Sequence, residues 1–320
     1  LFVPHCNFGT EYEVCRLAKK LNVPVLLWGP RDECPDENGM RLRDSQCGLF
    51  ATGKVLRRFG IPFTYLKNCN LEDECFAEGI DRFLRVCNVV KAFRNTRVLQ
   101  ISTRPFDFWS TMCNEGELLE KFGIQLSPIP MPELTQAMKD VKENSPEEIK
   151  EVTDYCREKM CIKVTPEQLD NVAALKIAMT RLGKKYGCNC GAIQCWNALQ
   201  DEIGIMPCAA NALCNDEGFP IACETDIHGA ITALMVEAAA MGETRSFFAD
   251  WTVRHPYNDN AELLQHCGPW PISIAKEKPT IDTPVAFDCS GSLMAQAKDG
   301  EHISLVRFDG DNGEYSLLLG

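Results

Sequence analysis

The chain has 320 residues, 45% of them hydrophobic and 24% charged, which is a globular composition long enough for two or three domains. Its formal charge is −12 and it has no basic patch, so binding to nucleic acid or to an anionic membrane is not expected. The sequence contains no run of about 18 apolar residues, so it predicts no transmembrane helix.

The 18 cysteines are spread evenly, and many lie in apolar segments, so we interpret them as small buried hydrophobic residues in a reducing cytoplasm. No Cys-x-x-Cys motif occurs, and the pair Cys188-x-Cys190 has poor spacing for a zinc site.

Residues 1–95 alternate short apolar runs with amphipathic segments. LFVP, VPVLLWG and PFTYLKN are typical of strands, whereas TEYEVCRLAKKL and GLFATGKVLRRFG have helical spacing, the second ending at Gly60. This alternation predicts β-α units and a parallel sheet. A long helix follows over about residues 73–93.

A second α/β unit is predicted to begin with the strand RVLQIST. SPEE (145–148) and TPEQ (165–168) each fit a capping box with proline at the first helical position. The second opens an amphipathic helix, whose apolar stripe consists of Leu169, Val172, Leu175, Met179, Leu182 and Tyr186. The strand GAIQCW, a short helix with Glu202, the apolar stretch PCAANAL, the turn NDEG, the strand PIAC and a helix near 228–241 then follow.

After about residue 245 the short runs PISIA, PVAFDC, ISLVRF and EYSLLLG predict a β-rich region. We therefore predict an α/β protein with two parallel-sheet α/β domains, 1–95 and 96–217, followed by a β-rich C-terminal domain, 218–320. The chain starts inside a strand-like run and stops without a closing element. We therefore expect a fragment whose first and last domains are incomplete.

The segment CETDIHG carries two carboxylates and an imidazole at alternate positions. If residues 224–228 are extended, Glu224, Asp226 and His228 share one face and could chelate a divalent metal. The alternative is structural: Asp226 caps the following helix, and Glu224 and His228 lie on a solvated rim.

Glu202 precedes the strand PIAC and could approach Asp226 at the carboxyl edge of the sheet, where ligands gather. Alone, it would be an ordinary surface glutamate. HCNFGTE, WGPRDE and TRPFDFW also follow apolar strands, but turn chemistry is the favoured explanation for each of them.

Long motifs in order resemble the L-fucose isomerase family, which belongs to a superfamily with L-arabinose isomerase. They are CNFGTE, PVLLWGPRDE, RLRDSQCGLFAT, STRPFDFW with NEGELLEKFGI, CWNALQDEIGIMPC, GFPIACETDIHGA and HCG (266–268). The resemblance spans essentially the whole chain.

This resemblance implies two α/β domains and a β-rich domain with the site at their junction. It also implies a homo-oligomer, commonly a hexamer, in which the first domain of one subunit covers a neighbour's site. The implied activity is that of an Mn²⁺-dependent aldose–ketose isomerase, with other divalent cations possible. By position, Glu202 and Asp226 match the glutamate and aspartate that bind the metal and act as acid and base. His5, Cys6 and Asn7 lie where the first domain reaches toward the substrate.

The family's third metal ligand is a histidine near the C-terminus, expected beyond residue 320, and the role is not transferred to His228 or His266. Glu224 is expected to support a metal ligand without binding the metal, or to pair with a neighbouring domain. A carboxylate base and a divalent ion suit proton transfer between C1 and C2 of a sugar through an ene-diol.

The sequence thus predicts an isomerase of L-fucose, D-arabinose or a related sugar. The alternative is a non-catalytic sugar-binding or sensor protein on the same scaffold. A thiol-redox or zinc protein is disfavoured because paired Cys-x-x-Cys motifs are missing.

Overall fold

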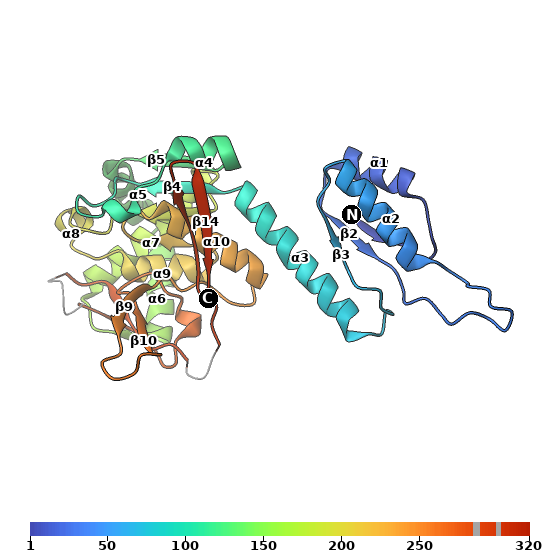
Figure 1. The fold of residues 1–320 in the computed structure, drawn as a ribbon. Coiled ribbons are helices and arrows are strands. Elements are labelled where there is room, and N and C mark those ends of the chain that lie inside the picture. The colour runs from blue at the N-terminus through green and yellow to red at the C-terminus, as the bar shows by residue number, and fades with distance from the viewer. Residues whose placement is uncertain (284–288, 299–301) are drawn as a thin grey trace. The chain divides into compact units, whose positions relative to one another are not determined.

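The structure is a computed structural model that describes residues 1–283, 289–298 and 302–320. The chain divides into two compact units, residues 1–88 and 89–320 (Figure 1). Helix α3 (Glu74–Arg94) begins in unit 1 and ends in unit 2. None of the described helices is both long enough and apolar enough to cross a bilayer.

Unit 1 is built on a three-stranded parallel sheet in the order β1-β2-β3. Its elements before α3 are β1 (Phe2–Pro4), α1 (Glu11–Leu21), β2 (Val25–Trp28), α2 (Ser45–Arg58) and β3 (Phe63–Tyr65). The central strand β2 is wholly buried, and its side chains alternate between the two faces. Val25 and Leu27 pack with apolar residues of α1 and α2, and Trp28 contacts Phe76 of α3 with ring centroids 5.0 Å apart.

Unit 2 contains a four-stranded parallel sheet in the order β5-β4-β7-β8. Through residue 240 its elements after α3 are β4 (Arg97–Ile101), the 3-10 helix η1 (Trp109–Thr111), α4 (Glu115–Phe122), β5 (Gln125–Ile129), α5 (Met131–Asn144), α6 (Pro146–Lys159), β6 (Cys161–Ile162), α7 (Pro166–Tyr186), β7 (Cys190–Ile193), α8 (Ala198–Ile203), α9 (Cys208–Asp216), β8 (Ile221–Ala222) and α10 (Ile227–Ala240). These elements confirm the predicted α/β class.

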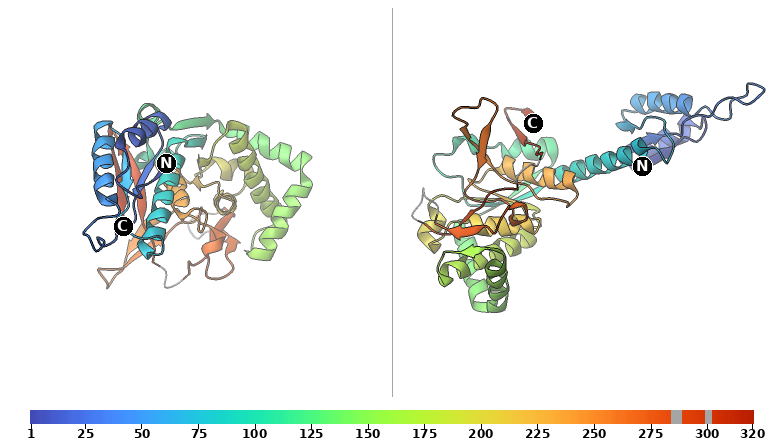
Figure 2. Two further views of the ribbon diagram at one scale, coloured as in Figure 1. Left: turned by 90° about the vertical axis from the view of Figure 1, so that its right-hand side faces the viewer. Right: turned by 90° about the horizontal axis from the view of Figure 1, so that it is seen from below.

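Alternate side chains along the strands give this sheet two buried faces. Leu99, Ile101 and Ile193 pack into a cluster with α5, α6, α7 and α9, whereas Val98 and Ala192 pack with α4 and α10 on the other face. Figure 2 shows the green helices α5 and α6 and the red C-terminal hairpin on opposite sides of unit 2 in both views.

The predicted capping boxes have different outcomes. Thr165 accepts a hydrogen bond from Gln168 N at 3.2 Å, and the Gln168 side chain accepts one from Thr165 N at 2.9 Å, so the TPEQ box is confirmed. The SPEE box is wrong, since Ser145 makes no capping bond and its hydroxyl instead accepts from Arg181. Pro146 still occupies the first turn of α6.

The later part of unit 2 holds short strands, as expected. They are β9 (Asp250–Arg254), β10 (Glu262–Gln265), β11 (Thr280–Asp282), β12 (Ser292–Met294), β13 (Val306–Asp311) and β14 (Glu314–Leu319). The predicted strand PISIA is wrong. It contains the 3-10 helix η2 (Ile272–Ile274), because the Asp216 carboxylate accepts hydrogen bonds from the backbone N–H groups at its start. PVAFDC lies mostly outside the described residues.

The four-stranded sheet continues across residue 217, because β8 follows that residue and pairs in parallel with β7. The hairpin β13-β14 packs against α10, where Phe308 N–H donates to the Thr232 hydroxyl at 3.0 Å. The predicted boundaries 1–95, 96–217 and 218–320 stay a prediction.

Candidate functional site

The loops at the carboxyl edge of the four-stranded sheet are tied to one another. The Ser102 hydroxyl after β4 donates to Gln194 Oε1 after β7 at 2.7 Å. The Thr225 N–H after β8 donates to the carbonyl of Ile193 at 3.0 Å, and its hydroxyl donates to the carbonyl of Thr103 at 3.1 Å. Ligands of parallel α/β sheets bind at this edge, so it is the candidate functional site of unit 2.

Backbone strain collects in the same loops. Ser102, Asn197, Glu224 and Thr225 all have positive φ angles between 53° and 69°, a region that residues other than glycine rarely occupy. Such a conformation costs about 1–3 kcal/mol per residue and persists where the surrounding contacts enforce it, which is common at functional sites. Because Glu224 and Thr225 are left-handed, the expectation that residues 224–228 are extended is wrong.

Asp226 is the N-cap of α10, as the structural alternative predicted. Its Oδ1 accepts a hydrogen bond from Gly229 N at 2.9 Å. Both carboxylate oxygens also accept from the guanidinium of Arg307 on β13, one of them at 3.2 Å. Asp226 is only 5% exposed, whereas its partner Arg307 is partly exposed, so the carboxylate side of this ion pair is the shielded one.

Glu224 and His228 are buried, at 9% and 2% exposure, and the expectation of a solvated rim for them is wrong. His228 Nδ1 lies 2.9 Å from an oxygen of Asp309, and its ring packs edge-on against Phe308. Burial lowers the pKa of His228, although the nearby Asp309 and Asp226 carboxylates partly oppose this effect.

The Glu224 carboxylate lies between a thiol and an imidazole. Its Oε1 accepts from Cys195 Sγ at 3.2 Å, and its Oε2 is 3.6 Å from Nε2 of the buried His266. Burial disfavours the His266 imidazolium, but Cys267 and Glu224 outweigh this effect and raise the pKa of His266 to about 10. These contacts come from segments 29 and 42 residues away from Glu224 in sequence, so no local motif indicated them.

Glu202 lies on the short helix α8, which follows β7 on the carboxyl side. Its side chain is exposed, and it makes no hydrogen bond or ion pair with any other residue that the structure describes. The structure therefore leaves this carboxylate open to solvent and to ligands. The assignment of Glu202 and Asp226 as catalytic and metal-binding residues stays a prediction.

The residues that the resemblance selected in unit 1 follow strand β1. His5 is buried, its N–H donates to the Trp28 carbonyl at 2.7 Å, and its Nδ1 lies 3.3 Å from the Phe8 carbonyl. Burial lowers the pKa of His5. Cys6 and Asn7 are exposed in the turn that follows. They lie at the carboxyl edge of the sheet of unit 1, and their substrate-binding role stays a prediction.

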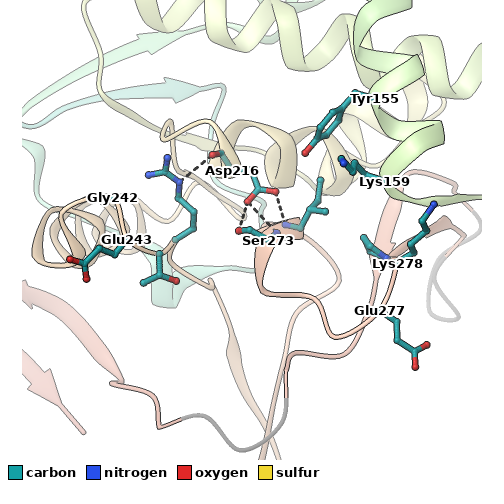
Figure 3. A pocket seen from close by; sticks show the side chains of 12 residues that line it. Tyr155, Lys159, Asp216, Gly242, Glu243, Ser273, Glu277 and Lys278 are labelled. Carbon is teal, nitrogen blue, oxygen red and sulfur yellow. Dashed lines mark hydrogen bonds between the residues drawn. The ribbon is translucent and has the colours of Figure 1, made fainter.

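An open pocket of about 570 Å³ lies elsewhere, at the ends of α9 and α10 (Figure 3). Helices that follow parallel strands return to the amino edge of the sheet, so this pocket is at the edge opposite the candidate site. Asp216 does not present a free carboxylate there, because Ile272 N and the Ser273 hydroxyl each donate to it at 2.7 Å. We interpret the pocket as structural.

The Mn²⁺ that the resemblance implies needs several oxygen ligands around one point. Both Asp226 oxygens already accept hydrogen bonds from Arg307, and Gly229 N–H donates to one of them. Glu202 is exposed on a different element. In this arrangement the two carboxylates do not provide a ready Mn²⁺ site, since a metal ion on Asp226 would have to displace the Arg307 guanidinium.

Arg307, Cys195 and His266 are the residues of the site that the sequence did not indicate. Arg307 is 81 residues from Asp226, and nothing in ISLVRF distinguishes a structural arginine from a functional one. The motif HCG contains His266, but its spacing assigns it no role, because only the fold brings its partner Glu224 to it.

Comparison with known proteins relates the chain to sugar isomerases. Residues 1–94 match the family model described as "Fucose/sulfoquinovose isomerase, N-terminal domain". Sulfoquinovose isomerases from Alkalicoccus urumqiensis, Priestia aryabhattai and Clostridium sp. (strain MSTE9) are each 25% identical to it, over 81%, 84% and 86% of this chain. The chain spans 57%, 59% and 61% of the length of these relatives. The family model over residues 1–94 and the similarity to sulfoquinovose isomerases both support a relationship of this chain to the fucose isomerase-like family.

Proposed function

We propose that this chain is part of an aldose–ketose isomerase that transfers a proton between C1 and C2 of an open-chain sugar through an ene-diol. The observation that carries the proposal is the 25% identity to sulfoquinovose isomerases over 81 to 86% of the chain. The strained, interlinked loops at the carboxyl edge of the sheet support this edge as the proposed place of the reaction.

We propose sulfoquinovose as the first substrate to test, followed by L-fucose and D-arabinose. Sulfoquinovose carries a sulfonate, and an anion of this kind needs a cationic partner. Arg104 follows β4 at the carboxyl edge. Its guanidinium donates to the carbonyls of Pro105 and Phe106, both at 3.2 Å, and it pairs with no carboxylate among the described residues. We propose Arg104 as the group that meets the sulfonate.

The proton transfer requires a base within reach of C1 and C2. Glu202 is the carboxylate that the family resemblance assigns to this role, and its exposure leaves it free to approach a sugar. Asp226 is held by Arg307 and by the start of α10, so its proposed role is to hold or orient groups near the substrate. Mn²⁺, the homo-oligomer and the cytoplasmic location stay predictions.

The test uses the protein expressed from its complete gene, incubated with Mn²⁺ in heavy water and with each sugar separately. We expect ketose formation and deuterium at C1 or C2, observed by NMR. Glu202→Gln should lower turnover at least about 10³-fold because it removes the base. Glu120 on α4 is also an exposed glutamate, so Glu120→Gln is the matched control and should retain activity.

Full activity in Glu202→Gln would refute the assigned base. Sugar binding without turnover in the wild-type protein would instead support the non-catalytic sugar-binding protein. For Arg104→Gln we expect a higher KM for sulfoquinovose and an unchanged KM for the neutral sugar L-fucose. An equal rise for both sugars would refute the sulfonate contact.

A further inference from the structure

Two neighbouring strands of unit 2 end in a buried group of soft ligand atoms. Cys195 follows β7, and Cys223 and Glu224 follow β8. The two Sγ atoms and a carboxylate oxygen of Glu224 all lie within 4.8 Å of one another. Ligand atoms of a tetrahedral zinc ion, with Zn–S bonds of about 2.3 Å, lie about 3.8 Å apart, so the separation suits a shared ion.

The fold holds this group together by several contacts. Cys195 Sγ donates to Glu224 Oε1 at 3.2 Å, and the Glu224 N–H donates back to Cys195 Sγ at 3.3 Å. The Glu224 carbonyl accepts from the Thr111 hydroxyl at 3.3 Å, and the left-handed Thr225 is tied to the loop after β4. The strained backbone at residues 224 and 225 thus positions the Glu224 carboxylate against the Cys195 thiol.

Residues around the group support ligand binding. His266 Nε2 lies 3.6 Å from the second oxygen of Glu224, the position of a partner that orients a metal-binding carboxylate. A Cβ atom at Gly268 would lie 3.3 Å from the sulfurs of both Cys208 and Cys223. The glycine therefore avoids crowding the sulfur side of the group.

Simple packing of small hydrophobic residues does not explain this arrangement. Cysteine packs well in an apolar core, but a carboxylate is costly to bury unless a cation or strong donors compensate it. His266 compensates one oxygen of Glu224 from 3.6 Å, whereas the other oxygen accepts from the Cys195 thiol. A bound cation would take the place of the thiol protons and neutralise the carboxylate.

We propose that Cys195, Cys223 and Glu224 bind one thiophilic divalent cation of the Zn²⁺ type, with His266 orienting Glu224 and a fourth coordination position left for water or another ligand. Two sulfur donors favour Zn²⁺ over Mn²⁺, so this site is distinct from the Mn²⁺ site predicted at Glu202 and Asp226.

The experiment measures metal binding and does not depend on isomerase activity. The protein expressed from its complete gene is stripped with chelator and titrated with Zn²⁺ alone, and bound zinc is measured after gel filtration. In parallel, Co²⁺ is added as a spectroscopic probe, because thiolate ligation gives an intense near-ultraviolet charge-transfer absorption. The variants are Cys195→Ser, Cys223→Ser and Glu224→Gln.

Cys214→Ser is the matched control. Cys214 is a fully buried thiol of α9 that lies 3.9 Å from the Thr180 hydroxyl and outside the proposed ligand set. Circular dichroism checks that each variant is folded, and Glu224→Gln provides a test that leaves both thiols in place.

We expect one zinc per chain and a thiolate–cobalt band in the wild type and in Cys214→Ser. Cys195→Ser and Cys223→Ser should each weaken zinc binding at least tenfold and reduce the band, and Glu224→Gln should weaken binding while keeping the band. No thiolate–cobalt band in the wild type, or equal zinc binding by the wild type and folded Cys223→Ser, would overturn the proposal. Loss of isomerase activity alone would bear only on the proposed function.

Discussion

Substitution of Asp226 separates its structural role from a role in the reaction. Asp226→Asn keeps a good N-cap for α10 but loses the charge that pairs with Arg307, whereas Asp226→Ala loses both. A lost N-cap costs about 1 kcal/mol. Charge-assisted hydrogen bonds are worth about 1.5–3 kcal/mol, but the Arg307 side chain is 33% exposed, so we discount this to about 1–2 kcal/mol.

We therefore expect the free energy of unfolding to fall by about 1–2 kcal/mol in Asp226→Asn and about 2–3 kcal/mol in Asp226→Ala. Urea titration followed by far-ultraviolet circular dichroism measures both values. Arg307→Gln is the partner variant, and the double variant with Asp226→Asn should be more stable than additivity predicts by about 1 kcal/mol, because the two groups contact each other.

The same variant tests the proposed reaction. If Asp226 binds a metal or orients the substrate, Asp226→Asn should remain folded yet lose most of the deuterium incorporation into the sugar. Equal unfolding free energies for the Asn and Ala variants would refute the capping argument. Unchanged isomerase turnover in the folded Asn variant would refute a functional role for this carboxylate.

Three further predictions concern stability. Thr165→Ala should lower the free energy of unfolding by about 1 kcal/mol in urea titration, because it removes the capping box of α7, and no change would contradict this reading. Burial raises the pKa of Glu237, with opposing hydrogen bonds from Ser246, so its ionisation costs stability as pH rises above about 4.5. The free energy of unfolding of Glu237→Gln, relative to that of the wild type, should therefore increase from pH 4 to pH 7.5. A relative increase toward acid pH would contradict this argument. Gly48→Ala should lower the stability of unit 1 by about 3 kcal/mol or more, since its Cβ would lie 1.9 Å from Phe8 O; a wild-type melting curve would refute this.

The sequence determined the elements of this protein wherever the local pattern was strong. The stripe from Leu169 to Leu182 and the capping box at Thr165 specify α7 without help from the rest of the chain, because spacing and capping act within one helix. The alternation of strands and helices likewise indicated the parallel sheets. The predictions for Ser145 and PISIA were wrong because residues distant in sequence form the hydrogen bonds there. Arg181 donates to the Ser145 hydroxyl, and Asp216 accepts from the backbone of PISIA.

Only the tertiary structure decided how the polar groups at the carboxyl edge are used. The sequence placed Glu224, Asp226 and His228 side by side, but two left-handed residues turn Glu224 toward Cys195 while Asp226 caps α10 and binds Arg307. The cluster of Cys195, Cys223 and Glu224 could not be predicted from the sequence, because its two cysteines are 28 residues apart and follow two strands that pair only in the fold. Contacts of this kind depend on which strands are neighbours in the sheet. The strand order depends on burial of the apolar faces of the whole sheet, which no local pattern specifies.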